Sequence, residues 1–246
     1  MKLETVKNDI HDFLSLNKDG VVVIWWATAT GKTWLSVQLS DFFNIEVISS
    51  DSRQIFKYMD IWTDKISQEI RQKLVHHQID ILDPDQTYTA WQRKIDSVKI
   101  ISDIQSRNMT PFIVWWTGLY IDTIYKNFDI PQVEPDFEYR ENLYKLHETN
   151  PSKLREMLNE VDPKEASNIH PNSSRYLVRA LEIYHKTGKP KSEIAKPNPV
   201  KNPLMMIWLR RQTWDTNKKI DTRINEMIDT WLIEEVKSLL DRWYTR

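Results

Sequence analysis

The chain has 246 residues, of which 40% are hydrophobic and 28% are charged, and its formal net charge is −1. This composition suits one sizeable packed domain or a core domain with an insertion. The near-zero charge excludes a global basic field for nucleic acid but allows a local basic patch. The absence of cysteine excludes a disulfide framework and cysteine-ligated zinc. The first residues lack the apolar core of a signal peptide and no apolar run approaches the roughly 18 residues that span a bilayer, so we expect a cytoplasmic protein without membrane association.

Three apolar runs in the first half of the chain predict buried strands. They are GVVVIWW (20–26), IEVISS (45–50) and TPFIVWW (110–116), all short and rich in β-branched residues. Residues 32–43 and 90–107, which lie between these runs, have helical spacing. The apolar face is expected to hold Leu35, Leu39 and Phe42 in the first helix and Ile95, Val98, Ile101 and Ile104 in the second. Strands that alternate with helices in this way predict an α/β fold, with a parallel sheet flanked by helices.

The second half of the chain opens with a proline-rich boundary at 128–140. Helices are expected after it at 141–149, 151–161 and 173–187.

A linker, AKPNPVKNP (195–203), ends this helical stretch. The apolar run LMMIWL (204–209) is suited to return to the sheet, and one last amphipathic helix is predicted over about 215–240. We therefore predict an α/β core in two parts with a helical insertion between them, at residues 1–127, 128–195 and 196–246.

The stretch WATATGKT (26–33) is close to a phosphate-binding loop, G-x-x-x-x-G-K-[ST], between a strand and a helix. Gly31, Lys32 and Thr33 match the motif, whereas Trp26 stands at its first glycine. Successive backbone N–H groups and the helix N-terminus would hold phosphate oxygens, with Lys32 as a point charge and Thr33 near Mg²⁺. We favour this interpretation over a helix that merely begins with Gly-Lys-Thr.

Two further polar residues follow predicted strands. Asp51, after the second strand, suits a general base or a magnesium site, and equally suits a helix cap. Thr117, after the third strand, would face the same crevice, although an ordinary turn is the favoured interpretation from spacing alone.

Two pairs of residues invite functional interpretations that spacing alone does not favour. His76 and His77 are adjacent and point in different directions in regular structure, so packing and hydrogen bonding are preferred to a shared metal ion. Arg175 and Arg179 lie one helical turn apart, where a polyanion would offset their repulsion. A solvated face paired with Glu182 explains them as well and is favoured.

These motifs, taken in order along nearly the whole chain, resemble those of the tRNA dimethylallyltransferases, also called tRNA isopentenyltransferases. The resemblance rests on ATATGKT, SSDSRQIFKYMDIWTDK, HHQIDILDPDQTYT, VWWTGLY, DPKEASNIHPNSSRYLVRALEIYHKTGKPKS and TRINEMIDTWLIEEV. It implies a P-loop NTPase-like parallel sheet with an inserted helical tRNA-binding domain. It also implies a monomer that transfers a dimethylallyl group from dimethylallyl diphosphate, with Mg²⁺, to N6 of adenosine 37 in the anticodon loop of tRNA, giving N6-isopentenyladenosine.

The resemblance also implies roles for particular residues. Asp51 would accept the proton of the adenine amine, Thr117 would hydrogen-bond the departing diphosphate and Arg223 would neutralise its charge. The diphosphate would be held by Thr28, Ala29, Thr30, Gly31, Lys32 and Thr33, with the metal near Thr33. The flipped-out base would be contacted by Asp51, Ser52, Arg53 and Gln54, and the tRNA backbone by Arg140, Arg175 and Arg179.

Glycine is scarce and tryptophan abundant in this chain. There are 4 glycines and 11 tryptophans, whereas average usage would give roughly 17 glycines. Tryptophan stands where the family usually has glycine at Trp26, Trp62, Trp115, Trp116, Trp231 and Trp243. We hypothesise that UGA codons meaning glycine have been read as tryptophan at these positions. An indole at Trp26 would otherwise obstruct the diphosphate loop.

Three other functions remain open from the sequence. A related transferase would prenylate free adenine nucleotides, and a generic phosphate-loop NTPase or kinase would turn over ATP without tRNA. A non-catalytic tRNA-binding relic follows if the tryptophans are genuine. The chain also stops soon after the Arg223 helix, where the family normally continues, so we expect a C-terminally truncated fragment.

Overall fold

The computed structural model describes residues 3–25, 32–115, 133–194, 202–209, 213–242 and 244, without the side chains of residues 32, 33, 115, 213 and 214. The chain divides into two compact units. The first is formed by Met1–Ile121 with Val200–Arg246, and the second by Asp122–Pro199. The boundaries expected at 127/128 and 195/196 lie outside the described residues, so they stay a prediction.

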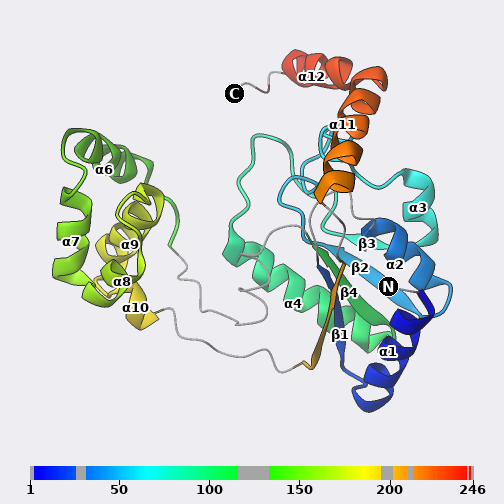
Figure 1. Ribbon diagram of the computed structural model, residues 1–246. Helices are drawn as coiled ribbons and strands as arrows, with labels where there is room; N and C mark the ends of the chain where they lie inside the picture. Colours follow the sequence, from blue (N-terminus) through cyan, green and yellow to red (C-terminus); the bar gives the residue numbers. More distant parts are fainter. Residues whose placement is uncertain are drawn as a thin grey trace. The chain divides into compact units, whose positions relative to one another are not determined.

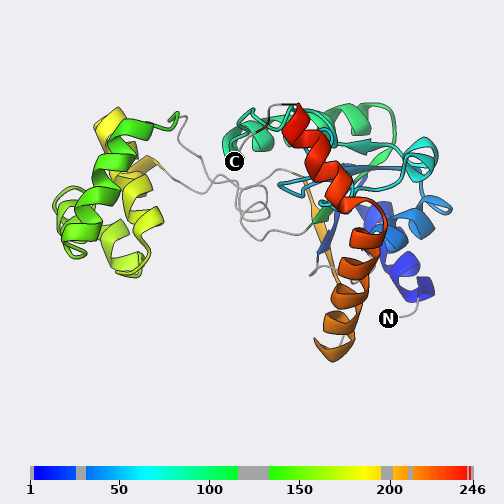
Figure 2. The ribbon, with the colours of Figure 1, turned by 90° about the horizontal axis from the view of Figure 1, so that it is seen from above.

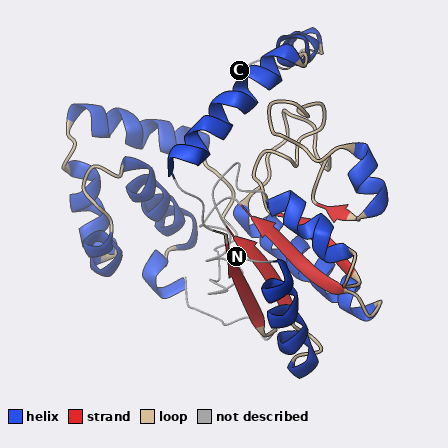
Figure 3. Ribbon diagram, turned by 45° about the vertical axis from the view of Figure 1, so that its right-hand side comes forward, coloured by secondary structure: helices blue, strands red, loops and turns tan. Residues whose placement is uncertain are grey.

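The first unit is built on a five-stranded, entirely parallel sheet (Figure 1, Figure 3). The strand order is β3-β2-β4-β1-β5. The strands are β1 (Val21–Trp25), β2 (Ile45–Ser49), β3 (His76–His77), β4 (Thr110–Trp115) and β5 (Leu204–Trp208). The α/β fold with a parallel sheet is thus confirmed, and LMMIWL does return to the sheet as an edge strand beside β1.

Helices cover both faces of this sheet. In Figure 2, α4 (Ala90–Ser106) lies on one side of the strands, and α1 (Leu3–Leu16) and α2 (Lys32–Ser40) lie on the other. The core under α1 and α2 includes Ile10 and Leu39, both fully buried. Short apolar strands alternate their side chains between the two faces, which explains why nearly every residue of β1 and β2 is buried.

Two expected core positions are wrong. Phe42 lies beyond the end of α2 at Ser40 and is half exposed. Val98 is 45% exposed, because the buried face of α4 runs through Arg93, Ser97, Ile101 and Ile104. The polar residues Arg93 and Ser97 thus form part of the buried face of α4, where the apolar spacing predicted Val98.

The C-terminal segment forms two helices, so the expected single helix over 215–240 is also wrong. α11 (Thr213–Asp229) and α12 (Leu232–Asp241) differ in direction, as Figures 1 and 2 both show. Trp231 separates them, with a left-handed backbone at φ 76° and ψ 25°. A left-handed residue cannot continue a right-handed helix, so the chain turns there.

The second unit is helical in its described part. Its helices are α6 (Phe137–Thr149), α7 (Lys153–Val161), α8 (Pro163–Asn168), α9 (Ser174–Thr187) and α10 (Lys191–Ile194). The predicted helices at 141–149, 151–161 and 173–187 correspond to α6, α7 and α9. Gly188 ends α9 with φ 66°, a conformation that glycine adopts without strain. Leu154, Leu158 and Leu177 are fully buried in the core of this unit.

No helix within the described ranges is both long and apolar enough to cross a membrane.

Candidate active site

The carboxyl ends of β2, β4 and β1 lie at one edge of the sheet, because the three strands are parallel neighbours in that order. The backbone N–H of Ser50, just past β2, donates to the carbonyl of Val114 in β4 at 3.1 Å. Asp51 therefore begins its loop level with the end of β4. In open α/β sheets this edge is where ligands bind.

Much of the predicted diphosphate site cannot be placed. Thr28, Ala29, Thr30, Gly31 and Thr117 lie outside the described residues. Lys32 and Thr33 form the start of α2, as the phosphate-loop motif predicts for a helix that begins at Gly-Lys-Thr, and their side chains are not described.

Asp51 is partly exposed and is fixed through its backbone. Its Oδ1 accepts a hydrogen bond from the backbone N–H of Arg53 at 2.8 Å, which turns the chain locally. The guanidinium of Arg93 donates to the carbonyls of Asp51 at 3.1 Å and Ser49 at 3.3 Å. Because Asp51 uses one oxygen for the turn, its second oxygen remains able to accept another proton or hydrogen bond.

Sequence reasoning missed Arg93. Its side chain is 1% exposed and reaches from α4 to the loop after β2. The sequence could have predicted its burial, because helical spacing places Arg93 on the same face of α4 as the apolar residues Ile101 and Ile104. A buried guanidinium needs hydrogen-bond acceptors, and strand-end carbonyls supply them here.

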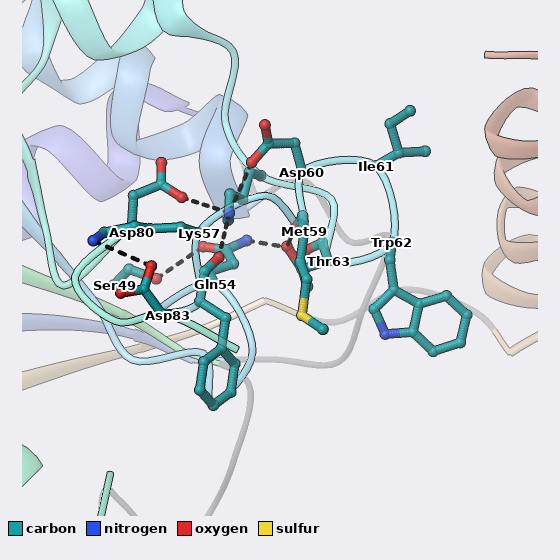
Figure 4. Close-up of polar contacts among 12 residues, drawn as sticks. Ser49, Gln54, Lys57, Met59, Asp60, Ile61, Trp62, Thr63, Asp80 and Asp83 are labelled. Atoms are coloured by element: carbon teal, nitrogen blue, oxygen red, sulfur yellow. Dashed lines mark hydrogen bonds and ion pairs between the residues drawn. The ribbon is translucent and has the colours of Figure 1, made fainter. Parts of the chain in front are cut away.

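Gln54 holds its own loop together. Its Oε1 accepts a hydrogen bond from Ser49 Oγ at 2.9 Å, and its Nε2 donates to the carbonyl of Thr63 at 3.3 Å (Figure 4). The same Nε2 donates to the carbonyl of Asp64 at 3.1 Å. The side-chain amide is thus engaged at both ends. Ser52 is partly exposed and Arg53 is exposed.

A buried lysine closes the same loop. Lys65 has a side chain 1% exposed and donates to the carbonyl of Phe56 and to carboxylates of Asp60 and Asp80, at 2.6 to 2.7 Å. Burial raises the pKa of Asp80, but hydrogen bonds from Lys65 and Arg71 outweigh it and leave the pKa below its ordinary value. Figure 4 shows these contacts as two groups in the same loop, one around Gln54 and one in which Asp60 and Asp80 converge.

Arg223, on α11, is brought to this loop by an ion pair. Its Nη1 lies 3.0 Å from Asp64 Oδ2. The arginine side chain is 24% exposed.

His76 and His77 contact different partners. His76 Nδ1 hydrogen-bonds the Leu74 carbonyl, and His77 Nε2 hydrogen-bonds Glu46 Oε2, each at 2.6 Å. Burial lowers the pKa of His76. Among the residues that the structure describes, no three His, Cys, Asp or Glu side chains form a group able to hold a metal ion.

The three arginines predicted to meet tRNA divide into two kinds. Arg140 and Arg179 both contact the buried carboxylate of Glu182, Arg140 through Nε at 2.7 Å and Nη2 at 2.8 Å, and Arg179 through Nη1. Burial raises the pKa of Glu182, but the hydrogen bonds from Arg140, the Asp136 backbone and Arg179 hold it below its ordinary value. Arg175 is exposed on α9. The pairing of Arg179 with Glu182 is the alternative that spacing favoured.

Fold and site together define a parallel α/β protein of the phosphate-loop type, in which α2 begins at Lys32 after β1, and the loop after β2 holds Asp51 and, through Asp64, Arg223. The IPP transferase family model matches residues 54–246. The tRNA dimethylallyltransferase of Thermotoga neapolitana is 40% identical over 92% of this chain and 74% of its own length, and that of Caldanaerobacter subterraneus is 42% identical with the same coverage.

Solved structures agree. The tRNA isopentenylpyrophosphate transferase of Bacillus halodurans matches with a TM-score of 0.61 at 36% identity, over 91% of this chain and 71% of that one. A eukaryotic dimethylallyltransferase acting on tRNA matches with a TM-score of 0.77 at 31% identity, over 91% of this chain and 56% of that one. The chain belongs to the IPP transferase family, the family of the tRNA dimethylallyltransferases, and has their P-loop NTPase-like fold.

Proposed function

We propose that this protein transfers a dimethylallyl group from dimethylallyl diphosphate to N6 of adenosine 37 in tRNA, acting as a monomer in the cytoplasm. One observation of the structure carries the proposal within the family. Asp51 lies at the sheet edge to which β1 leads, and the Asp64–Arg223 ion pair brings a cation to the same loop. A base and a cation near a diphosphate site are what alkyl transfer from a diphosphate requires.

The donor diphosphate is proposed to lie on residues Thr28 to Thr33, at the N-terminus of α2. Backbone N–H groups and the helix dipole favour an anion there, and Lys32 adds a point charge. Thr33 is in the first turn of α2, and its hydroxyl together with diphosphate oxygens forms the oxygen-rich donor set that Mg²⁺ prefers. Bound there, Mg²⁺ would neutralise charge on the diphosphate.

Asp51 is proposed as the general base. The adenine N6 attacks the allylic C1 of the donor, the C1–O bond to diphosphate breaks, and the N6 proton passes to the Asp51 carboxylate. The fixed backbone supports this role, as does a side chain that makes one hydrogen bond among the described residues, through Oδ1. Ser52, Arg53 and Gln54 are proposed to contact the flipped-out base. Both the oxygen and the nitrogen of the Gln54 side-chain amide are hydrogen-bonded within the loop. Gln54 would therefore contact the base through its backbone or after its side chain rearranges.

The departing diphosphate is proposed to be stabilised by Arg223 and Thr117. Negative charge develops on the leaving oxygens as C1–O breaks, so fixed donors and cations lower the barrier. Arg223 keeps its guanidinium oriented by Asp64. Arg140, Arg175 and Arg179 are proposed to meet the tRNA backbone, with Arg175 the most available because it is exposed.

Transfer from labelled dimethylallyl diphosphate tests the proposal, with tRNA and AMP as alternative acceptors. The proposal predicts label in tRNA and none in AMP. Label in AMP alone would establish a free-nucleotide transferase instead, and ATP turnover without tRNA would indicate an NTPase or kinase. Retention of tRNA without binding of the donor in calorimetry would identify a non-catalytic relic.

A further inference from the structure

The carboxylate of Glu235, on α12, is bound by three consecutive backbone N–H groups of the loop after β2. Asp60 and Ile61 donate to its Oε2 at 2.6 and 2.7 Å, and Trp62 donates to its Oε1 at 3.0 Å. Consecutive amides that converge in this way form an anion-binding concavity. Here the anion comes from the protein itself, across 173 to 175 residues of sequence.

A second contact joins α12 to the same loop. The guanidinium of Arg242, at the end of α12, lies 4.2 Å from the centre of the Tyr58 ring. Tyr58 has φ 65° and Asp64 has φ 52°, so the loop turns through the left-handed region on both sides of the Glu235 contact. Such a conformation persists when surrounding contacts determine it. Figure 4 shows Ile61 and Trp62 at the outer end of the loop, away from the network around Gln54.

The loop that Glu235 binds leads directly to both proposed functional groups. Thr63 and Asp64, the next residues, accept hydrogen bonds from Gln54, which in turn accepts one from Ser49, two residues before Asp51. Asp64 also orients Arg223. A displacement at residues 60–62 is therefore passed by hydrogen bonds to the Asp51 turn and by an ion pair to the Arg223 guanidinium.

We infer that Glu235 is a positioning residue: by filling the amide concavity of residues 60–62, it holds the loop that sets Asp51 and Arg223 in register. Charge-assisted hydrogen bonds to an ionised carboxylate are shorter and stronger than neutral ones, and Glu235 accepts three of them from the loop. The inference rests on the proposed function for what the loop positions. The contact itself rests on geometry alone.

Glu234 supplies a matched control. It is the neighbouring glutamate on the same helix turn and is exposed, whereas Glu235 is partly buried against the loop. The experiment compares Glu235→Gln and Glu234→Gln by amide hydrogen exchange of peptides that cover residues 50–65, and by steady-state transfer from dimethylallyl diphosphate to tRNA. The glutamine keeps the size of the side chain but replaces one acceptor oxygen with a donor that faces backbone N–H groups.

Glu235→Gln is expected to speed exchange in residues 58–65 by about tenfold, leaving sheet peptides unchanged, because the loop opens locally rather than globally. The same variant is expected to lower kcat by about tenfold, with KM for the donor within about twofold. Glu234→Gln is expected to change neither. Unchanged exchange in the sheet peptides separates positioning from a general loss of folded protein, which would speed exchange throughout the first unit.

Equal exchange in the two variants overturns the inference. So does a wild-type kcat in Glu235→Gln despite faster loop exchange, because the loop would then not position the reacting groups. The transfer assay uses the version with glycine at positions 26, 62, 115, 116, 231 and 243 as parent, and absence of prenyl transfer by that parent refutes the proposed function instead. In that case the exchange comparison alone decides whether Glu235 holds the loop.

Discussion

Arg223 on α11 and Asp64 in the loop after β2 form an ion pair at 3.0 Å, although 159 positions separate them in the chain. The pair ties the last third of the sequence to the edge of the sheet where β2 ends. It also holds a permanent cation against the loop that carries the proposed general base, Asp51.

Arg223→Ala is expected to lower kcat for prenyl transfer by about 10²- to 10³-fold, the usual cost of removing one group that stabilises developing negative charge. Arg223→Lys keeps the charge but loses the planar fork, so an intermediate loss is expected. Steady-state transfer to tRNA measures both. Arg223→Ala with wild-type kcat would remove this arginine from the leaving-group site.

Asp51→Asn is expected to lower kcat by about 10²- to 10⁴-fold, because the amide cannot accept the N6 proton. The asparagine oxygen still accepts the hydrogen bond from the Arg53 N–H, so the turn and the thermal midpoint should be retained. Asp41→Asn, at an exposed position after α2, is the control. An active Asp51→Asn protein would assign the base elsewhere.

Glu46 gives the first unit an acid-sensitive contact. The Arg107 guanidinium, with Nη2 at 2.8 Å, lowers the pKa of this buried carboxyl from 4.5 to about 2 despite its burial, and His77 contributes in the same direction. The folded-state pKa lies below the unfolded value. The stabilisation is therefore complete above about pH 4.5 and is lost as pH falls towards 2.

Denaturant unfolding at several pH values checks this dependence. Glu46→Gln is expected to lower the free energy of unfolding by about 2 kcal/mol at pH 7, a moderate figure because Arg107 is partly exposed and keeps Asp103 as a partner. The difference between wild type and variant should shrink between pH 4.5 and 2. A constant difference across that range would show that Glu46 is not the titrating group.

Glu182 is expected to stabilise the second unit, because it is the shared anion of Arg140 and Arg179. Glu182→Gln leaves Arg140 and Arg179 without their shared anion and should destabilise this unit by about 3 kcal/mol. Amide exchange of residues 133–194 measures the loss, with exposed Glu138→Gln as control.

Arg175 is the complementary case. Because it is exposed, Arg175→Ala should weaken tRNA binding, with a smaller dependence on salt, and leave the exchange of the second unit unchanged. Unchanged tRNA affinity would remove Arg175 from the interface.

Trp231 provides a physical test of the glycine hypothesis. Its φ of 76° is strained for any L-residue, and its indole is 69% exposed, so little packing opposes replacement. Trp231→Gly should raise the free energy of unfolding by about 1 kcal/mol, whereas Trp231→Ala, which keeps a Cβ, should recover little of that. Trp62 does not have a positive φ in the described structure, so Trp62→Gly should bring no such gain. Equal effects at both positions would contradict this explanation.

Strands and most helices followed from local pattern, because a buried β-branched run such as Val21–Trp25 has few other conformations. Two kinds of feature did not. The break at Trp231 depends on a positive φ angle, which a tryptophan in the sequence does not predict. The apolar periodicity continues past this residue, so it predicted one helix. The roles of Arg93, Lys65 and Glu235 depend on acceptors and donors far away in sequence, which only the folded chain brings together.

For the site, motif order located Asp51 and Arg223 but not what surrounds them. Gln54 is predicted to contact the target base, and nothing in the sequence indicated that its side chain also joins two segments of one loop. The two-residue strand β3 likewise forms only because β2 offers a partner edge.

The most direct test of the account is the position of the transferred group. The chain as written, and the version with glycine at 26, 62, 115, 116, 231 and 243, are each incubated with dimethylallyl diphosphate, Mg²⁺ and tRNA that carries adenosine at position 37. Digestion and mass spectrometry then locate the modified nucleoside. We predict N6-dimethylallyl adenosine at position 37 with the glycine version, and far less with the chain as written, because an indole at position 26 would obstruct the diphosphate loop. Unmodified tRNA with both proteins, or modification elsewhere, would contradict the account.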